Sequence, residues 1–318
     1  MPTLWQRLLI AAVCASAIAI GSHATTAQSR SPGSPAAAAP LARAASGDPD
    51  LEGVWNYATM TPLERPREFA DRAVLSEADA AAYEQRTNER QAAANNTAGP
   101  DWWDPGTRRL TDRRTSLIVD PDNGRMPPLT PAAEARAAAR AQARRGRGPT
   151  EGPEDLELNV RCLQWATAGP PMLPGVYNNN VQILQTRDHA VLLNEMIHDA
   201  RIVPMNGGPH GAVPRWMGDS RGRWDGATLV IETIHISDKS GFRGSDENLR
   251  LVERLTRIDR GTIDYRFTVE DPTVWTRPWT AAFPLRRSTT PLYEYACHEG
   301  NYRSIEGLLR AARLADVK

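Results

Sequence analysis

The second half of the chain alternates apolar and polar positions with a period of two, in short runs that end at turn residues. Such alternation is typical of β-strands with one buried face. The runs predict strands over 182–186, 190–197, 200–204, 215–219, 228–236, 249–257, 262–269, 279–285 and 292–297. Because no helical pattern separates them, we expect antiparallel strands in a barrel or a sandwich. A closed or half-closed antiparallel β-barrel, lipocalin-like in architecture, fits this mainly β pattern best.

Two segments before these strands have the features of helices. Ser76 can cap the first, ahead of an alanine-rich run, and a proline directly after Thr130 opens the second. We expect helical insertions near 75–94 and 130–146, at the periphery of a single barrel-type domain that spans 50–318.

The first strand is expected near Gly53-Val54-Trp55. Lipocalin-like barrels begin with a Gly-x-Trp, in which the glycine permits a kink and the tryptophan plugs the closed end. A simple first strand with a core tryptophan fits the same tripeptide, so the signal stays open between the two interpretations.

The N-terminal residues have the composition of a targeting segment. Residues 1–27 match a cleavable signal peptide, with Arg7 near the start and an apolar run over 8–20. Residues 28–49 are rich in serine, proline and alanine and are expected to form a disordered tether. No later apolar run approaches a membrane-spanning length. We therefore expect a periplasmic or secreted protein that is not inserted in a membrane after cleavage.

Charge and cysteine content narrow the picture further. The formal net charge is zero, so nothing favours a nucleic acid as partner. After signal cleavage two cysteines remain, Cys162 and Cys297, and in an oxidising compartment they are expected to form a disulfide worth about 4–5 kcal/mol. The alternative is a reactive cysteine beside His298.

Residues 194–201 bring together an acid, an imidazole, a second acid and a guanidinium: Glu195, His198, Asp199 and Arg201. On a regular strand, Glu195, Asp199 and Arg201 share one face and His198 lies on the other. The flanking apolar residues do not decide which face points inward. We expect the four side chains in one cavity-facing cluster, with His198 as the acid/base group because imidazole titrates near neutral pH. The alternative is a rim histidine that only pairs with a carboxylate.

Further residues are candidates for contacts with a small-molecule substrate or ligand. They lie in loops or at strand ends: Trp102, Trp103, His210, Arg277, Tyr295 and His298. A tryptophan pair offers a large flat surface, and an arginine between tryptophans can stack on a ring or hold a carboxylate. The tryptophan pair could equally well pack in the hydrophobic core. The residues from Arg277 to His298 could equally well have the structural role of closing the barrel beside the disulfide.

The common cofactor and nucleophile signatures are missing from the sequence. Glu195-x-x-His198 has the spacing of a di-iron helix but lacks a second copy, and no histidine pair has zinc-site spacing. Ser220 stands near a glycine in a strand–turn–strand context, unlike a nucleophile elbow. We expect no metal and no cofactor.

Several blocks of the sequence are long and specific. They lie at 114–121, 177–180, 194–201, 216–222, 242–244, 269–279 and 293–302. In these blocks the chain resembles a family of exported proteins of environmental bacteria to which no activity is assigned. The resemblance implies an exported globular domain, and it transfers no activity.

Three functions fit this reading. The leading hypothesis is an exported, cofactor-independent acid/base enzyme, namely a lyase, isomerase or hydrolase that acts on a small organic molecule in the barrel cavity. The alternative is a non-catalytic binding protein for a hydrophobic or aromatic ligand, and a third possibility is a structural envelope protein. A catalytic cavity needs an acid/base group with a shifted pKa, whereas a binding cavity needs only an apolar lining with a few polar anchors.

Overall fold

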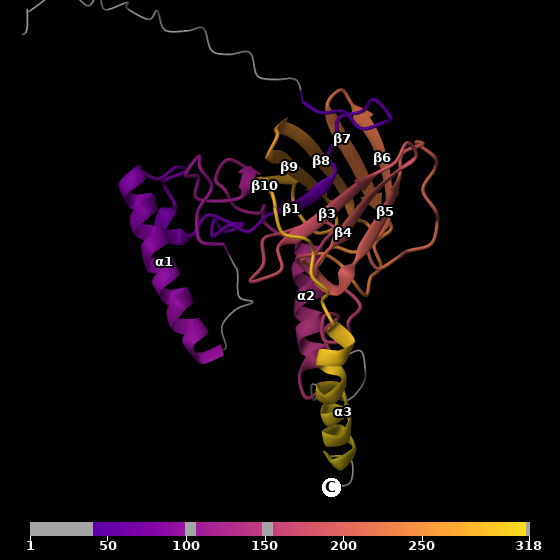
Figure 1. The fold of residues 1–318 in the computed structure, drawn as a ribbon. Helices are drawn as coiled ribbons and strands as arrows, with labels where there is room; N and C mark the ends of the chain where they lie inside the picture. Colours follow the sequence, from indigo (N-terminus) through magenta and orange to yellow (C-terminus); the bar gives the residue numbers. More distant parts are fainter. Residues whose placement is uncertain (1–40, 99–105, 148–154, 316–318) are drawn as a thin grey trace, which may run out of the picture. The chain divides into compact units, whose positions relative to one another are not determined.

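The computed structural model describes residues 41–98, 106–147 and 155–315 (Figure 1). Its strands are β1 (Gly53–Asn56), β2 (Ile118–Asp120), β3 (Asn180–Gln185), β4 (His189–Asn194), β5 (Ala200–Pro204), β6 (Asp219–Asp225), β7 (Thr228–Ile234), β8 (Arg250–Asp259), β9 (Thr262–Glu270) and β10 (Trp279–Arg287). Its helices are α1 (Glu77–Ala98), α2 (Pro131–Arg144) and α3 (Cys297–Ala315), with short 3-10 turns η1 (Arg67–Phe69) and η3 (Met196–His198).

The strands form one antiparallel sheet that closes on itself almost completely. Their order is β5-β4-β3-β1-β10-β9-β8-β7-β6, and β2 pairs with β10. The two edge strands, β5 and β6, lie next to each other without a backbone ladder between them in the described residues (Figure 1). The predicted fold class, a mainly antiparallel β-barrel with a few helices, is confirmed.

Alternate residues of the long strands point into the barrel. On β8, Leu251, Glu253 and Leu255 are buried, and the residues between them are partly exposed. On β9, Tyr265 packs edge-on against Phe283 of β10, with ring centroids 5.1 Å apart. Large side chains thus fill the interior, which is a packed core.

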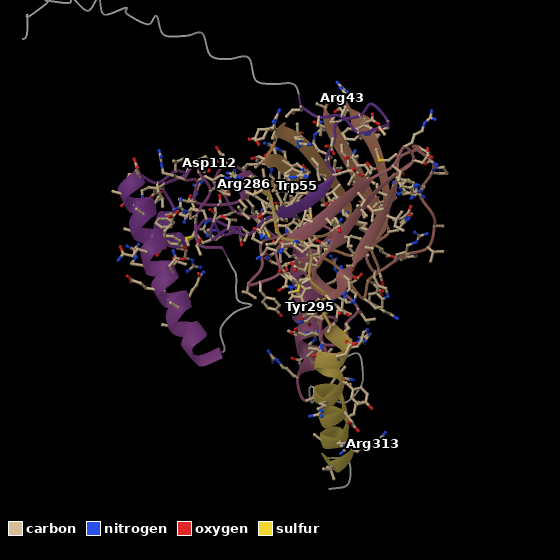
Figure 2. The ribbon with its side chains drawn as sticks, viewed as in Figure 1. Arg43, Trp55, Asp112, Arg286, Tyr295 and Arg313 are labelled. Carbon is tan, nitrogen blue, oxygen red and sulfur yellow. A yellow bond between two sulfur atoms is a disulfide. The ribbon has the colours of Figure 1, made fainter. Side chains whose placement is uncertain are left out.

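Trp55 of β1, labelled in Figure 2, is fully buried beside residues at the ends of β8 and β10. Gly53 has φ +129°, a conformation that only glycine adopts readily, and Trp55 two residues later is fully buried. The indole N–H donates to the carbonyl oxygen of Leu51 at 2.9 Å. The guanidinium groups of Arg257 and Arg287 stand 5.9 and 5.5 Å from the indole ring. The Gly-x-Trp tripeptide therefore forms a strand whose tryptophan lies among strand ends.

The two predicted helices are present. The Ser76 hydroxyl accepts from the Asp79 backbone N–H at 3.1 Å and so caps α1. Thr130 caps α2 by accepting from the Ala133 N–H at 3.1 Å, and Pro131 takes the first helical position. The chain has further ordered structure before β1: a turn in which Arg43 pairs with Pro49.

Because of that turn, the folded part begins at residue 41 and not at residue 50 as expected. Of the predicted tether over 28–49, residues 41–49 are folded, and the remainder lies outside the described residues, as does the predicted signal peptide. No helix in the described part of the chain is long and apolar enough to cross a membrane.

The strand predicted over 292–297 is wrong. Residues 291–296 have no regular structure, and α3 begins at Cys297. The alternation Tyr293-x-Tyr295-x-Cys297 suggested a strand, but β10 already pairs with β1, β2 and β9 and leaves no edge for it to join. Leu309 and other apolar residues of α3 recur at helical spacing, a pattern the short strand-like run concealed.

The strand predicted over 215–219 is also wrong, because β6 begins only at Asp219. Ser220-Arg221-Gly222 lies within β6 and is not a turn. A Cβ at Gly222 would collide with Met205 and with Val203 of β5. The glycine therefore serves the close approach of β5 to β6 at the seam of the barrel.

Candidate functional site

The octet at 194–201 is a strand, a turn and a second strand. β4 ends at Asn194, whose N–H donates to the Asp199 carbonyl at 2.8 Å, and β5 begins at Ala200. Between them, Ile197 and His198 have φ values of 56° and 43°. Two left-handed residues break the two-residue periodicity, so the expectation that Glu195, Asp199 and Arg201 share one strand face is wrong.

Glu195 is buried and joins three segments of backbone. Its carboxylate accepts from the Asn180 side-chain amide and from the Tyr293 N–H, the latter at 3.1 Å. Its own N–H donates to the Asn180 carbonyl at 3.0 Å. These bonds tie the β4–β5 turn to β3 and to the segment that follows β10, which is a structural role.

Arg201 points into the barrel. It forms a two-pronged ion pair with Glu253 of β8, one bond of which measures 2.9 Å. The Tyr265 hydroxyl donates to Glu253 at 2.6 Å and accepts from the Met172 N–H at 3.1 Å. Burial acts to lower the pKa of Arg201, but the Glu253 carboxylate outweighs it and raises that pKa.

His198 and Asp199 lie at the turn, where His198 is exposed. Burial raises the pKa of Asp199 to about 6, against the opposing effects of His198 and of a hydrogen bond from the Trp165 backbone. One carboxylate oxygen, Oδ2, is buried and accepts no hydrogen bond from the residues that the structure describes. Within the described residues no bond or ion pair joins Arg201 to Glu195, His198 or Asp199, so the expected single cluster does not form.

Asp199→Asn is expected to stabilise the protein at neutral pH and to have little effect near pH 4. The folded state holds this proton more tightly than the unfolded chain, because the pKa rises from 3.8 to about 6 on folding. The group's contribution to stability is therefore complete below its unfolded pKa and is lost as pH rises through its folded pKa.

Urea unfolding of both proteins across this pH window checks the prediction, with Asp188→Asn on the exposed β3–β4 turn as the matched control. A difference between wild type and Asp199→Asn that stays constant with pH would contradict it.

Glu195 and His198 share one small cavity of about 360 Å³, which they line with Leu193, Leu292 and Glu294. The cavity does not include Asp199 or Arg201. Two of the four octet residues are thus brought together at a surface, and the catalytic role predicted for them stays a prediction.

His210 lies on the outside of the barrel. Its Nδ1 is 3.0 Å from Asp219 and its Nε2 is 3.5 Å from Glu232. Burial acts to raise the pKa of Asp219, but the Gly211 N–H and the Arg221 guanidinium lower it overall. The glycine-rich segment before His210 is therefore held against β6 and β7.

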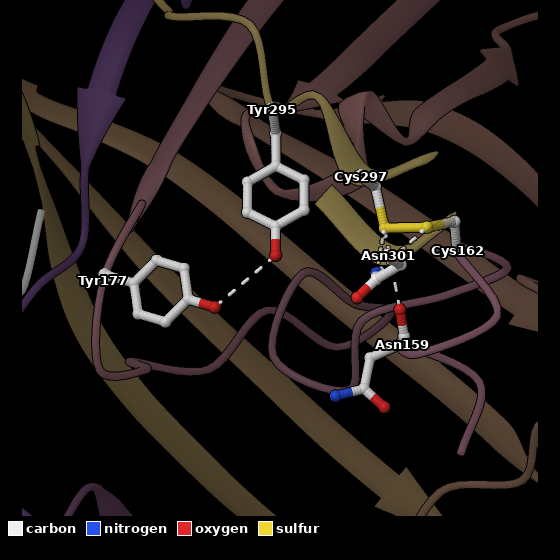
Figure 3. Close-up of a disulfide and its surroundings, with 6 residues drawn as sticks. All are labelled: Asn159, Cys162, Tyr177, Tyr295, Cys297 and Asn301. Carbon is white, nitrogen blue, oxygen red and sulfur yellow. Dashed lines mark hydrogen bonds between the residues drawn. A yellow bond between two sulfur atoms is a disulfide. The ribbon is translucent and has the colours of Figure 1, made fainter. Parts of the chain in front are cut away.

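Tyr295 belongs to an aromatic cluster beside the disulfide (Figures 2 and 3). Its ring stacks on Tyr177 at 6.4 Å and meets the edge of Trp165 at 6.3 Å. Cys162 and Cys297 form the predicted disulfide, and the Asn301 amide donates to both sulfur atoms (Figure 3). The cluster fixes the 162–165 segment against the start of α3.

The remaining candidates are separate from these. Arg277 is exposed and pairs with Asp120 at 2.6 Å, and His298 is exposed in the first turn of α3. Trp102 and Trp103 lie outside the described residues. No cluster of three or more histidine, cysteine, aspartate or glutamate side chains suited to a metal ion occurs in the part of the chain that the structure describes.

A larger pocket, of about 730 Å³, lies between α2 and the segments that precede β3 and β8 in the chain. We call it the end pocket. Its walls are the 157–173 segment, the 238–246 loop between β7 and β8, and the second half of α2. Trp165, Leu173 and Phe242 supply apolar surface to it. This volume is in the range of small-molecule pockets, roughly 300–1,000 Å³.

Gln164 lines the end pocket and is 9% exposed. Its side-chain N–H donates to the Gly169 carbonyl at 3.4 Å, while its Oε1 is buried and has no partner within the described part of the chain. A buried acceptor without a donor costs about 1–3 kcal/mol, so this oxygen is a position where a ligand N–H or O–H would be stabilised.

The sequence did not single out Gln164, Trp165 or Lys239 as site residues. They lie in segments without strand or helix periodicity, and their meeting depends on the long-range disulfide and on strand order. One local signal existed: Phe242 is an isolated large apolar residue in a loop of glycine, serine and charged residues.

Comparisons with known proteins add little to this description. No protein-family model matches the chain, and no curated protein matches it. Among solved structures, the crystal structure of a mutant of the fluorescent protein UnaG aligns with 35% of this chain and 72% of that chain, at 15% identity and a TM-score of 0.23. Similarity at this level supports no statement about the site.

Proposed function

We propose that this protein binds a small, partly apolar organic molecule in the end pocket, without catalysing a reaction on it. The observation that carries the proposal is the 730 Å³ pocket itself, whose lining residue Gln164 has a buried Oε1 without a partner among the described residues. A pocket with apolar walls and few polar anchors is what a binding site needs. The described lining of this pocket contains no histidine.

Aromatic side chains held in place by their neighbours support the proposal. The Trp165 ring meets the edge of Tyr177 at 5.7 Å, and Phe242 stacks on buried Trp279 at 6.1 Å. Walls that are already ordered lose little side-chain entropy when a ligand binds, so affinity is not spent on ordering them.

Para-butylphenol is expected to bind in the end pocket more tightly than para-butylanisole, by about fivefold or more. The phenol donates an O–H to Gln164 Oε1, whereas the methyl ether has no donor and leaves that oxygen desolvated and unpaired. A penalty of about 1–3 kcal/mol corresponds to a difference in Kd of roughly 5-fold to 150-fold. Isothermal titration calorimetry with both compounds measures the difference.

Gln164→Met keeps the approximate side-chain volume and removes the acceptor, so it should make the two affinities equal. The control Gln182→Met, on β3, should preserve the difference. Absence of saturable binding of either compound by the wild type would reject the proposed site. Equal affinities in the wild type would reject the role of Gln164.

Acid/base catalysis is the second candidate. The observation that favours it is the shared cavity of Glu195 and His198, described above. Both carboxylate oxygens of Glu195 already accept hydrogen bonds from Asn180 and Tyr293, which suits a structural carboxylate better than a general base. We therefore place binding first.

A further inference from the structure

The 238–246 loop is held rigidly at the mouth of the end pocket. Phe242 stacks on Trp279 with an interplanar angle of 26°. The Ser245 hydroxyl donates to the buried carboxylate of Asp271, and the Ser240 hydroxyl donates to the Trp216 carbonyl at 2.7 Å. Three anchors within six residues fix the path of the loop and therefore the positions from which its charged side chains extend.

Several cations of the pocket lining have no carboxylate partner among the described residues. Lys239 and Arg243 extend from this loop and Arg144 from α2, and none of them has a carboxylate within ion-pair distance among the described residues. Arg140 is different, because it pairs with Asp246 at 3.5 Å.

The balance of charge in the lining is positive. Four cations line the pocket, namely Arg140, Arg144, Lys239 and Arg243, against three acids, namely Glu157, Asp238 and Asp246, which leaves a net charge of plus one. The whole chain is neutral, so the positive balance is local. Arg144 near the C-terminus of α2 also complements the helix dipole, and the Arg243 guanidinium stands 5.8 Å from the centre of the Phe242 ring. Neither Lys239 nor Arg243 has a carboxylate partner among the described residues.

We infer that the ligand of the end pocket is an organic acid whose apolar body lies against Trp165 and Phe242 and whose anionic group is bound by Lys239 and Arg243. This inference rests on the proposed function. Arginine and lysine on a fixed loop bind carboxylate oxygens through charge-assisted hydrogen bonds, which are stronger than neutral ones. The Asp238 and Glu157 carboxylates disfavour such a ligand, but the cations outnumber them.

The test uses three compounds that share a phenol and differ only in the charge of the tail. They are para-hydroxyphenylpropionate, its neutral amide and the cation tyramine. Calorimetry on the full mature chain is expected to give the acid a Kd about tenfold lower than that of the amide, with tyramine weakest. The advantage of the acid should shrink at high salt, because exposed charges are screened.

Lys239→Gln and Arg243→Gln should each reduce the preference for the acid about threefold and leave the Kd of the amide unchanged. Arg187→Gln makes the same charge change on the turn between β3 and β4, at the other end of the barrel, and should alter neither.

If the acid and the amide bind equally, or if tyramine binds best, the inference is overturned while the proposed binding function stands. If none of the three compounds binds, the proposed function itself fails.

Discussion

Replacing Cys162 and Cys297 together by serine is expected to lower the free energy of unfolding by up to about 5 kcal/mol. The disulfide joins residues 135 positions apart, so it removes a large loop-closure entropy from the unfolded chain. It also fixes the 162–165 segment, which carries Gln164 and Trp165 of the end pocket, against the first turn of α3 (Figure 3). The double variant should therefore bind para-butylphenol more weakly as well as unfold more easily.

Urea unfolding with and without a reducing agent measures this effect. The reductant should shift the midpoint of the wild type toward that of the double variant and leave the double variant unchanged. Thiol titration of the unreduced, denatured protein without residues 1–27 should find no free thiol. Equal midpoints for wild type and double variant would show that the disulfide does not contribute to the free energy of unfolding.

A disulfide is stable in oxidising compartments, which supports the proposal of a periplasmic or secreted protein. The predicted signal peptide would account for export, and it lies outside the described residues. Localisation is therefore a proposal that rests on the sequence and on this one bond.

Strand alternation in the sequence located most of the barrel, because buried and exposed faces impose a period of two wherever a strand has neighbours on both sides. β5 was predicted at its observed bounds, and β7 to β10 within a few residues. The predictions failed where a residue is required by a contact with a segment distant in the sequence. Gly222 resembled a turn residue, yet it is required by the approach of β5.

Charged residues on the strands suggested a site, but most of them have a different role. On the outer face, Arg254 pairs with Asp225 of β6 at 2.8 Å, and Arg250 pairs with Glu232 and Glu270. The Arg250 pairs join neighbouring strands, whereas the Arg254–Asp225 pair reaches across β7. Sequence alone cannot separate them from a catalytic cluster, since both place acids and cations at alternate positions.

The prediction of one cluster within residues 194–201 failed for a related reason. Alternation assumes a continuous strand, and the positive φ values at Ile197 and His198 are set by the hairpin they close. The end pocket was not predicted because its walls come from three segments distant in sequence. The order of the strands in the sheet brings these three segments together, and the periodicity of apolar residues carries no information about strand order.

Arg201→Met is expected to lower the free energy of unfolding by about 3–5 kcal/mol, because it leaves the Glu253 carboxylate buried without its cation. Glu253 is fully buried and Arg201 is 6% exposed, so water cannot replace the lost partner. The Tyr265 hydroxyl still donates to Glu253 at 2.6 Å, but a single neutral donor does not offset the desolvation of a charge. Chemical denaturation at neutral pH measures the loss.

The double variant Arg201→Met with Glu253→Met should be more stable than Arg201→Met alone, because it removes the stranded charge and fills the same volume with apolar atoms. The matched control is Arg254→Met on the same strand as Glu253, whose partner Asp225 is exposed. Breaking that exposed pair should cost less than about 1 kcal/mol. If Arg201→Met costs no more than Arg254→Met, the interior of the barrel admits water to Glu253 and is not the packed core inferred from its burial. A double variant less stable than Arg201→Met would mean instead that the ion pair itself stabilises the barrel beyond what apolar packing supplies.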